Sequence, residues 1–151
     1  MSLWLADTNV LLRAIQRDDL HTRTLARTAL KTIHRRGDSV CVLPQNLMEL
    51  WAVATRPLDV NGLGLSVQHA ARAVSVCESF FAVLPETAAI FPEWRRLVLA
   101  YQVVGLKAHD THLVAAMVVH SVKRILTFDA HDFSRYREIE AVQPIQLAGG
   151  P

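Results

Sequence analysis

Leu3-Trp4-Leu5-Ala6-Asp7-Thr8-Asn9 places four apolar residues directly before a polar triplet. Arg124-Ile125-Leu126-Thr127-Phe128 has the same character and runs into Asp129. Apolar runs of this length are typical of strands that are covered on both faces of a parallel sheet. In an open sheet of that kind, ligands bind outside the carboxyl ends of the strands. The polar residues that follow these two runs are therefore the first candidates for a functional site.

The rest of the chain alternates short apolar runs with helical patterns. Further strands are expected at Val40–Leu43, Phe81–Leu84 and Val142–Leu147, the last at the sheet edge because it contains Pro144. The Gly- and Pro-rich stretch Arg56–Ser66 is expected to be a loop. This alternation predicts an α/β domain with a mainly parallel sheet, and residues 1–151 are expected to form one domain. Helices are expected near Val10–Gln16, Leu20–Arg36, Gln45–Arg56, Ser66–Phe80, Phe91–Val104 and His109–Val122.

Composition places the chain among folded proteins. Its 151 residues are 51% hydrophobic and carry a formal net charge of +2, whereas disordered segments are poor in apolar residues and highly charged. The sequence has no apolar run near the ~20 residues of a membrane-spanning helix, and its start does not resemble a signal peptide. We therefore expect a cytoplasmic protein that does not bind membranes. Cys41 and Cys77 are expected to be buried free thiols.

Four acidic residues stand where predicted strands end or helices begin. Asp7 and Asp129 follow the two apolar runs quoted above. Asp110 begins the helix before the second run, and Glu49 lies in the helix after the second predicted strand. Asp7 and Asp110 are also typical of helix caps, and Asp129 is typical of a turn. Asp132 lies three residues further on and is a second candidate for the acidic position after this strand.

Helical phase distinguishes Asp110 from Glu49. The apolar stripe of the Asp110 helix contains Leu113, Val114 and Met117, and Asp110 is in phase with it, so its carboxylate should point inward. Glu49 lies about 150° from the apolar stripe of its own helix, at ~100° per residue, and therefore faces either solvent or a cleft. An isolated buried carboxylate is costly, so Asp110 needs a partner.

The acidic residues are stronger evidence for a functional site together than any one of them is alone. In a parallel sheet, Asp7 and Asp129 leave the same edge, and Asp110 is in phase to join them. Carboxylates gathered within a few ångströms repel one another, and their pKa values rise. A hard divalent cation such as Mg²⁺ removes that repulsion and prefers oxygen ligands. One or two such ions can activate a water against a phosphodiester, so the acids predict a metal-dependent hydrolytic site.

Four short motifs, in this order, resemble the PIN-domain family and, within it, the VapC-type toxins. They are Asp7-Thr-Asn9, Glu49 within Asn46-Leu-Met-Glu-Leu-Trp51, Asp110 within His109-Asp-Thr-His-Leu-Val-Ala-Ala-Met117, and Thr127-Phe-Asp129 followed by Asp132-Phe133. The resemblance extends from about Leu3 to Leu147. It implies a three-layer fold in which helices flank a five-stranded parallel sheet.

The resemblance also implies a function. The chain would be an endoribonuclease that uses Mg²⁺ or Mn²⁺, the toxin of a toxin–antitoxin system, a homodimer, and the partner of a small antitoxin protein that blocks its site. The family's Thr-x-Asp pattern favours Asp129 over Asp132 as the fourth acid. The implied catalytic and metal-binding residues are Asp7, Glu49, Asp110 and Asp129, with Asn9 and Thr127 as supporting polar groups.

The expected reaction is an in-line attack of water on phosphorus, with Glu49 orienting that water or acting as general base. With the four candidate ligands set aside, ten acidic residues remain against 16 Lys and Arg, so the remaining surface is basic and suits RNA. Arg13 with Arg17, and Arg23 with Arg27, share helix faces. These pairs could hold RNA phosphates, an acidic antitoxin segment or only water.

Two other functions stay open from the residues alone. An aspartyl-nucleophile phosphatase or dehalogenase would use Asp7 covalently, although such enzymes commonly carry a second acid where this chain has Asn9. A catalytically silent PIN-like module would only bind RNA or a protein. RNA cleavage with Mg²⁺ or Mn²⁺, compared with EDTA and with Asp7→Asn, separates these functions.

Overall fold

A five-stranded sheet lies at the centre of the computed structural model, which describes residues 1–148. The strand order is β3-β2-β1-β4-β5, and every neighbouring pair is parallel. The predicted five-stranded parallel sheet is confirmed. The strands are β1 (Leu3–Ala6), β2 (Ser39–Val42), β3 (Ala82–Val83), β4 (Arg124–Leu126) and β5 (Glu140–Val142).

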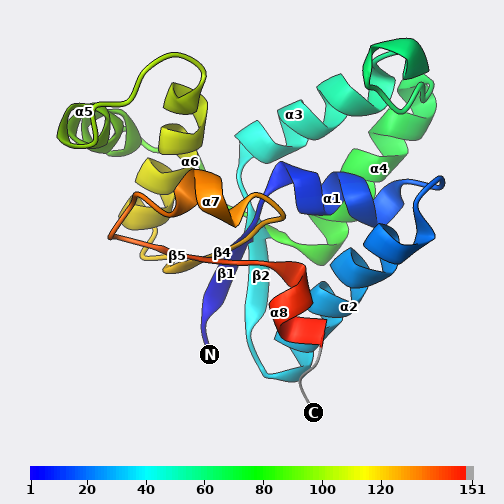
Figure 1. The fold of residues 1–151 in the computed structure, drawn as a ribbon, viewed down its shortest axis with the longest axis horizontal. Helices are drawn as coiled ribbons and strands as arrows, with labels where there is room; N and C mark the ends of the chain where they lie inside the picture. The colour runs from blue at the N-terminus through cyan, green and yellow to red at the C-terminus, as the bar shows by residue number, and fades with distance from the viewer. Residues whose placement is uncertain (149–151) are drawn as a thin grey trace.

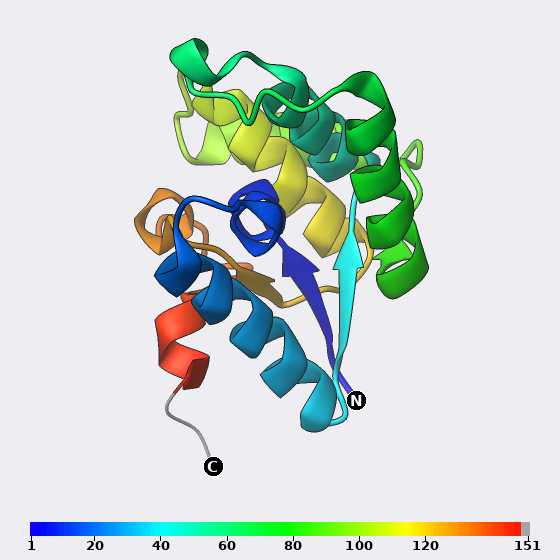
Figure 2. The same ribbon diagram turned by 90° about the vertical axis from the view of Figure 1, so that its right-hand side faces the viewer.

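Helices cover both faces of the sheet, which gives the three layers that the resemblance implied (Figures 1 and 2). The first group packs on one face: α1 (Thr8–Ile15), α2 (Leu20–Arg35), α3 (Pro44–Thr55), α4 (Val67–Phe80) and α8 (Pro144–Ala148). The second group packs on the other face: α5 (Ile90–Ala100), α6 (Lys107–Val119) and the short α7 (Ala130–Phe133).

Alternation along the strands explains why both faces are covered. Leu5 and Ile125 belong to the core that contains α5 and α6, whereas Trp4 and Leu126 belong to the core that contains α2 and α8. All four side chains are at most 4% exposed. The apolar runs of the sequence therefore supply two cores at once, as expected for parallel strands.

The strand order creates a topological switch point between β1 and β4. From β1 the chain continues to β2 and β3 on one side, and later returns to β4 and β5 on the other. Ala6 and Leu126 are paired at the ends of β1 and β4, and the backbone N–H of Asp7 donates to the Leu126 carbonyl at 2.9 Å. The residues that leave this point are placed where open α/β sheets bind ligands.

Helix starts follow the capping signals of the sequence. The side chains of Asp19 and Ser66 accept hydrogen bonds from the backbone N–H groups of Thr22 and His69. Pro44 is the first residue of α3, where its missing N–H is not needed. Between α3 and α4, a Cβ on Gly62 would lie 1.9 Å from the Arg56 carbonyl oxygen, so only glycine fits.

The end of the chain corrects one expectation. Val142–Leu147 was expected as a strand, but β5 ends at Val142 and Pro144 begins helix α8. Pro144 is therefore a first-turn proline, like Pro44, and the Gln146 side chain accepts a hydrogen bond from the Gln143 N–H at 2.7 Å. The expected edge position is nevertheless correct, because β5 is the last strand of the sheet.

Other boundaries differ by a few residues. The helix expected to reach Val104 ends at Ala100, because Gln102 adopts a left-handed conformation with φ of 53°. The helix expected from His109 begins at Lys107. The second shift matters for the site described next, because it brings Lys107 into the first turn of α6.

Cys41 and Cys77 are free and buried, as expected. Burial raises the pKa of the Cys41 thiol to about 12 and that of Cys77 to about 11, so both remain protonated and unreactive. Among the described residues, no helix combines the length and the apolar character that a membrane crossing requires.

Candidate active site

Asp7 is the most buried of the predicted acids, with 9% of its surface exposed. It caps α1 directly after β1, and its Oδ1 accepts a hydrogen bond from the Thr8 N–H at 2.8 Å. Its Oδ2 accepts from the hydroxyl of Thr127, which is fully buried, at 2.8 Å. Both carboxylate oxygens are therefore fixed by groups at the ends of the two central strands.

The environment raises the pKa of Asp7 from 3.8 to about 6. Burial is the largest cause, and the hydrogen bonds from Thr127 and Thr8 oppose it. The charges of Asp110 and Glu49 raise this pKa further. Residues 7, 49 and 110 therefore lie close enough to repel one another, although they are far apart in the sequence.

Glu49 faces the site, which resolves the choice that its helical phase left open. Its Oε2 accepts a hydrogen bond from the Thr8 hydroxyl at 2.9 Å. Its Oε1 accepts from the Gln45 side chain, one turn earlier in α3, at 2.6 Å. The fully buried Asn46 also donates to the Thr8 hydroxyl, at 3.2 Å. Glu49 is thus linked to the Asp7 side of the site by side-chain contacts.

Asp110 lies in the first turn of α6 and is half-buried, as its phase predicted. Burial raises its pKa, and the charges of Asp132 and Glu49 add to that effect. Lys107 opposes it: its ammonium group lies 3.7 Å from Asp110 Oδ2 and 2.8 Å from Asp132 Oδ1. An ammonium group therefore bridges two carboxylates on this side of the site.

Asp129 is exposed and joins the site through polar neighbours. The Asn9 side chain donates to Asp129 Oδ2 at 3.1 Å and to the Thr127 hydroxyl at 3.3 Å. The Thr127 hydroxyl also accepts a hydrogen bond from the Asp129 N–H at 3.0 Å. Asn9 and Thr127 thus connect Asp129 to Asp7, and the supporting role that the resemblance implies for them stays a prediction.

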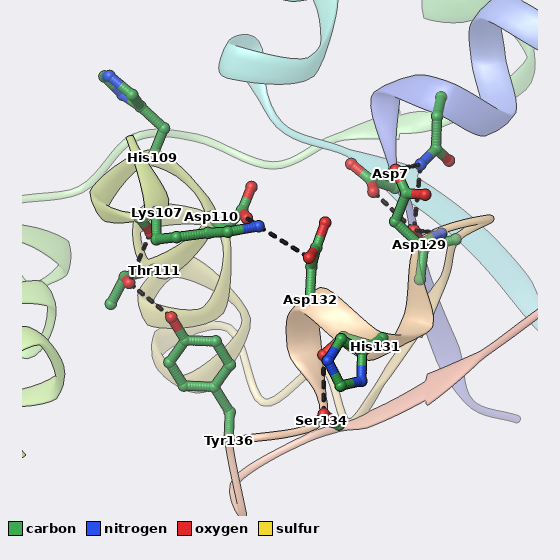
Figure 3. A network of polar contacts seen from close by, with 12 residues as sticks. Asp7, Lys107, His109, Asp110, Thr111, Asp129, His131, Asp132, Ser134 and Tyr136 are labelled. Atoms are coloured by element: carbon green, nitrogen blue, oxygen red, sulfur yellow. Dashed lines mark hydrogen bonds and ion pairs between the residues drawn. The ribbon is translucent and has the colours of Figure 1, made fainter. Parts of the chain in front are cut away.

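Figure 3 shows how these groups lie. Asp7 and Asp129 leave the ends of β1 and β4, Asp110 and Lys107 approach from α6, and Asp132 stands between the two sides. His109 points away from the carboxylates in this view. The structure therefore brings all four predicted acids to one edge of the sheet and adds Asp132 as a fifth.

The sequence left open whether Asp129 or Asp132 is the fourth acid of the site, and the structure gives both residues neighbours in it. Asp129 is connected to Asp7 through Asn9 and Thr127, whereas the charge of Asp132 acts on Asp110. Sequence reasoning missed Lys107 and Gln45. The sequence spacing could have indicated both residues. Lys107 precedes Asp110 by three residues and Gln45 precedes Glu49 by four. These separations place side chains on the same face of a helix.

The donor chemistry of the site fits Mg²⁺ or Mn²⁺. The groups that converge are carboxylate and hydroxyl oxygens, which hard cations prefer. Burial is the largest cause that raises the pKa of Asp7 and of Asp110, and neighbouring carboxylates raise both further. Within residues 1–148, no three His, Cys, Asp or Glu side chains are gathered tightly enough to ligate one ion. Lys107 instead neutralises Asp110 and Asp132.

Two arginines singled out for phosphate contact have structural partners. Arg23 donates to the Gln16 carbonyl at 3.5 Å, and Arg27 donates to the Ala14 carbonyl at 2.8 Å. These carbonyls lie at the end of α1, where helix C-termini have unsatisfied acceptors. The two side chains therefore tie α2 to the helix that begins at Asp7.

A family model for the PIN domain matches residues 5–139. The chain belongs to the PIN-domain family. The match spans Asp7, Glu49, Asp110 and Asp129, so the resemblance seen in four short motifs is confirmed at the level of the family. No curated protein matches the chain in sequence.

Solved structures share the PIN-domain fold of this chain at low sequence identity. A chain of VapBC2 from Rickettsia felis, bound to a promoter DNA fragment, has a TM-score of 0.68 and 12% identity over 93% of this chain and 98% of that chain. A chain of DNA-bound VapBC from Salmonella typhimurium has a TM-score of 0.67 and 18% identity over 95% of this chain and 99% of that chain. A chain of a toxin–antitoxin complex from Klebsiella pneumoniae has a TM-score of 0.64 and 18% identity over 95% of this chain and 98% of that chain.

Proposed function

We propose that this PIN-domain chain is a Mg²⁺- or Mn²⁺-dependent endoribonuclease and the toxin of a toxin–antitoxin pair. The observation that carries the proposal is the convergence of Asp7, Glu49 and Asp110 at the carboxyl edge of the central strands, where the charges of Glu49 and Asp110 raise the pKa of Asp7. Membership of a family of nucleases supports the reaction class.

Asp7, Glu49 and Asp110 would hold the cation, with Asp129 or Asp132 as a further ligand. A bound divalent ion neutralises the carboxylates, activates water and stabilises charge on the phosphoryl oxygens. The chain's own groups orient the carboxylates: Thr8 and Thr127 donate to Glu49 and Asp7. These donors fix the direction of each carboxylate, and the carboxylates would have to draw closer together to share one cation.

Glu49 is the best-placed proton acceptor. It is partly exposed and is held on both oxygens by hydrogen-bond donors, whereas Asp7 is almost completely buried. A water near Glu49 can transfer a proton to this carboxylate as the water attacks phosphorus. Asp7 therefore serves mainly as ligand and Glu49 mainly as base or water-orienting group.

The proposed partners are RNA and an antitoxin protein. The fold likeness to a chain of a toxin–antitoxin complex supports the second partner. The basic excess that remains outside the four acids supports an anionic substrate, because neutralising phosphates releases counterions and strengthens binding at low salt. We also propose a homodimer, which light scattering on the purified chain would test.

The decisive experiment measures cleavage of RNA oligonucleotides with Mn²⁺, with Mg²⁺, with EDTA and with Asp7→Asn. Cleavage that needs the cation and is lost in Asp7→Asn supports the nuclease. Asn has nearly the shape of Asp and retains one oxygen, which can accept either the Thr127 or the Thr8 hydrogen bond, and the melting temperature of the variant checks that it folds. Calorimetric titration with Mn²⁺ gives an independent measure of cation binding.

Other outcomes identify the alternatives. Equal cleavage in all four conditions would overturn the proposal. Absence of cleavage together with tight RNA binding would indicate a silent binding module, and a covalent adduct trapped on Asp7 would indicate an aspartyl nucleophile. Growth arrest on expression, relieved by the protein encoded next door, would test the toxin assignment separately from the chemistry.

A further inference from the structure

Glu49 is held by two separate lines of hydrogen bonds, one to each carboxylate oxygen. On Oε2 the line is short: the Thr8 hydroxyl donates at 2.9 Å and itself accepts from Asn46 Nδ2 at 3.2 Å. Asn46 is fully buried, and its Oδ1 accepts from the Leu43 N–H at 2.8 Å. Because the Glu49 carboxylate can only accept, the Thr8 hydroxyl directs its proton at Glu49 and uses a lone pair to accept from Asn46.

The line on Oε1 is longer and joins three elements. Gln45 Nε2 donates to Glu49 Oε1 at 2.6 Å and to the His109 carbonyl at 3.2 Å. Both amide hydrogens are therefore used, and Gln45 Oε1 must accept. The group that it contacts is Nδ1 of His112, on the second turn of α6.

His112 is held from its other side as well. Its Nε2 lies 2.7 Å from Glu86 Oε1, in the connection between β3 and α5. The line therefore runs from Glu86 through His112 and Gln45 to Glu49. Gln45 Oε1 and Glu86 Oε1 are both acceptors, so each contact is a hydrogen bond only where the facing ring nitrogen of His112 carries a proton. A side chain as long as Gln45 is usually free to change rotamer, and this line removes that freedom.

We propose that Gln45 and His112 are positioning residues for Glu49. This inference rests on the proposed function, in which Glu49 faces the cation or the attacking water. His112 donates a hydrogen bond to Gln45 Oε1 and so fixes the Gln45 amide. The fixed amide donates to Glu49 Oε1 and holds that carboxylate in one orientation. Small displacements of a reacting group are costly: a misplacement of about 1 Å can lower a rate by about 10²-fold.

The rival explanation is structural, because the same contacts also join α3, α6 and the β3–α5 connection. The chain provides a matched control for it. His120, at the end of α6, lies with its Nε2 2.9 Å from the Pro85 carbonyl in the same connection. His120 thus contacts the residue next to Glu86 but leads to no catalytic carboxylate.

The experiment compares Gln45→Met, His112→Leu, His112→Asn and His120→Leu with the unaltered chain. Met has the length of Gln but cannot donate to Glu49. Asn places an amide N–H where His112 has Nδ1, whereas Leu has no donor. For each variant we would measure kcat and KM on an RNA oligonucleotide, the Kd for Mn²⁺ by calorimetry, and the melting temperature.

We expect Gln45→Met and His112→Leu to lower kcat by about tenfold, with KM for RNA unchanged and Mn²⁺ bound several-fold more weakly. His112→Asn should recover most of the lost kcat, because it restores the donor. His120→Leu should retain full kcat, even if it lowers the melting temperature as much as His112→Leu does.

Equal kcat in His112→Leu and His112→Asn, or an unchanged kcat in Gln45→Met, would overturn the inference. So would losses that simply follow the melting temperature across all four variants. If the unaltered chain neither cleaves RNA nor binds Mn²⁺, the proposed function itself fails, which is a different outcome from intact activity that does not respond to Gln45 or His112.

Discussion

Asp7 and Asp110 meet at one site, but the contacts that hold them differ. Asp7 belongs to a hydrogen-bonded side, which comprises Asp7, Thr8, Asn9, Thr127 and Asp129. Asp110 belongs to an ion-paired side, which comprises Lys107, Asp110 and Asp132. Neutral donors fix the first side, whereas an ammonium group balances the second.

The two sides show that the orientation of a carboxylate and the balance of its charge are controlled by different contacts. Hydrogen bonds to Asp7 fix its geometry but do not neutralise it, and burial still raises its pKa to about 6. Lys107 lowers the cost of the negative charge on Asp110, but a single flexible side chain does not fix the carboxylate in one position. We infer that the hydrogen-bonded side sets where a cation binds and that the ion-paired side adjusts how tightly it binds.

The largest expected effect is on catalysis by the hydrogen-bonded side. Asp7→Asn should lower kcat/KM for RNA by about a thousandfold, since a cation site is worth several kcal/mol of charge stabilisation. Asp132→Asn, on the ion-paired side, should lower it by about tenfold or less, because Lys107 already neutralises this carboxylate. Initial rates at saturating Mn²⁺ measure both. Equal losses in the two variants would contradict the division of the site.

The second prediction concerns stability and pH. The folded state raises the pKa of Asp7 from 3.8 to about 6, so between these values the folded chain binds more protons than the unfolded chain. Its free energy of unfolding must therefore fall as pH rises through this window, by up to about 3 kcal/mol from this group. Asp7→Asn should lack that part of the decline.

Urea unfolding of both proteins from pH 3.5 to 7, in EDTA, would measure the difference. Saturating Mn²⁺ should reduce the decline in the unaltered chain, because a ligand that binds only the folded state stabilises it. A pH profile that is the same for Asp7→Asn and for the unaltered chain would show that Asp7 is not the group responsible.

The third prediction tests the hydrogen bonds themselves. Thr127→Val keeps the shape of a fully buried side chain but removes the donor to Asp7 Oδ2 and the acceptor for the Asp129 N–H. We expect a loss of about 1–3 kcal/mol in unfolding free energy. The pKa of Asp7 should rise further, because the Thr127 hydrogen bond lowers it.

Thr111→Val is the matched control for this variant. Thr111 is also fully buried, and its hydroxyl bonds to the Lys107 carbonyl and to Tyr136. Both variants should lose stability, but only Thr127→Val should move the acidic limb of the pH–rate profile to higher pH. A shift of the same size in Thr111→Val would assign the effect to general loosening of the structure.

The two sides also differ in how far the sequence could predict them. Asp7 follows a buried strand, and Asp110 is in phase with an apolar stripe, so local patterns locate both. The contact between Thr8 and Glu49 joins residues 41 positions apart, and that between Asn9 and Asp129 joins residues 120 apart. Periodicity carries no information on such pairs, so the roles of Asn46 and His112 appear only in three dimensions.

Local patterns also fail where one residue type has two uses. Pro144 fits an edge strand or the first turn of a helix, and the sequence reasoning chose the strand. The structure uses Pro144 in α8 as it uses Pro44 in α3. The choice depends on whether Gln146 reaches back to the Gln143 N–H, a contact that no apolar pattern encodes.

The smallest effect is expected on the ion-paired side. If a divalent cation replaces the ammonium group as the neutralising charge, Lys107→Met should tighten Mn²⁺ binding. A unit charge about 4 Å away contributes about 1 kcal/mol in water, which corresponds to about fivefold in Kd. Lys123→Met, an exposed lysine just before β4, removes the same charge and should leave Kd nearly unchanged. Unchanged or weaker Mn²⁺ binding in Lys107→Met, with a higher KM for RNA, would mean that Lys107 contacts substrate phosphate and does not compete with the cation.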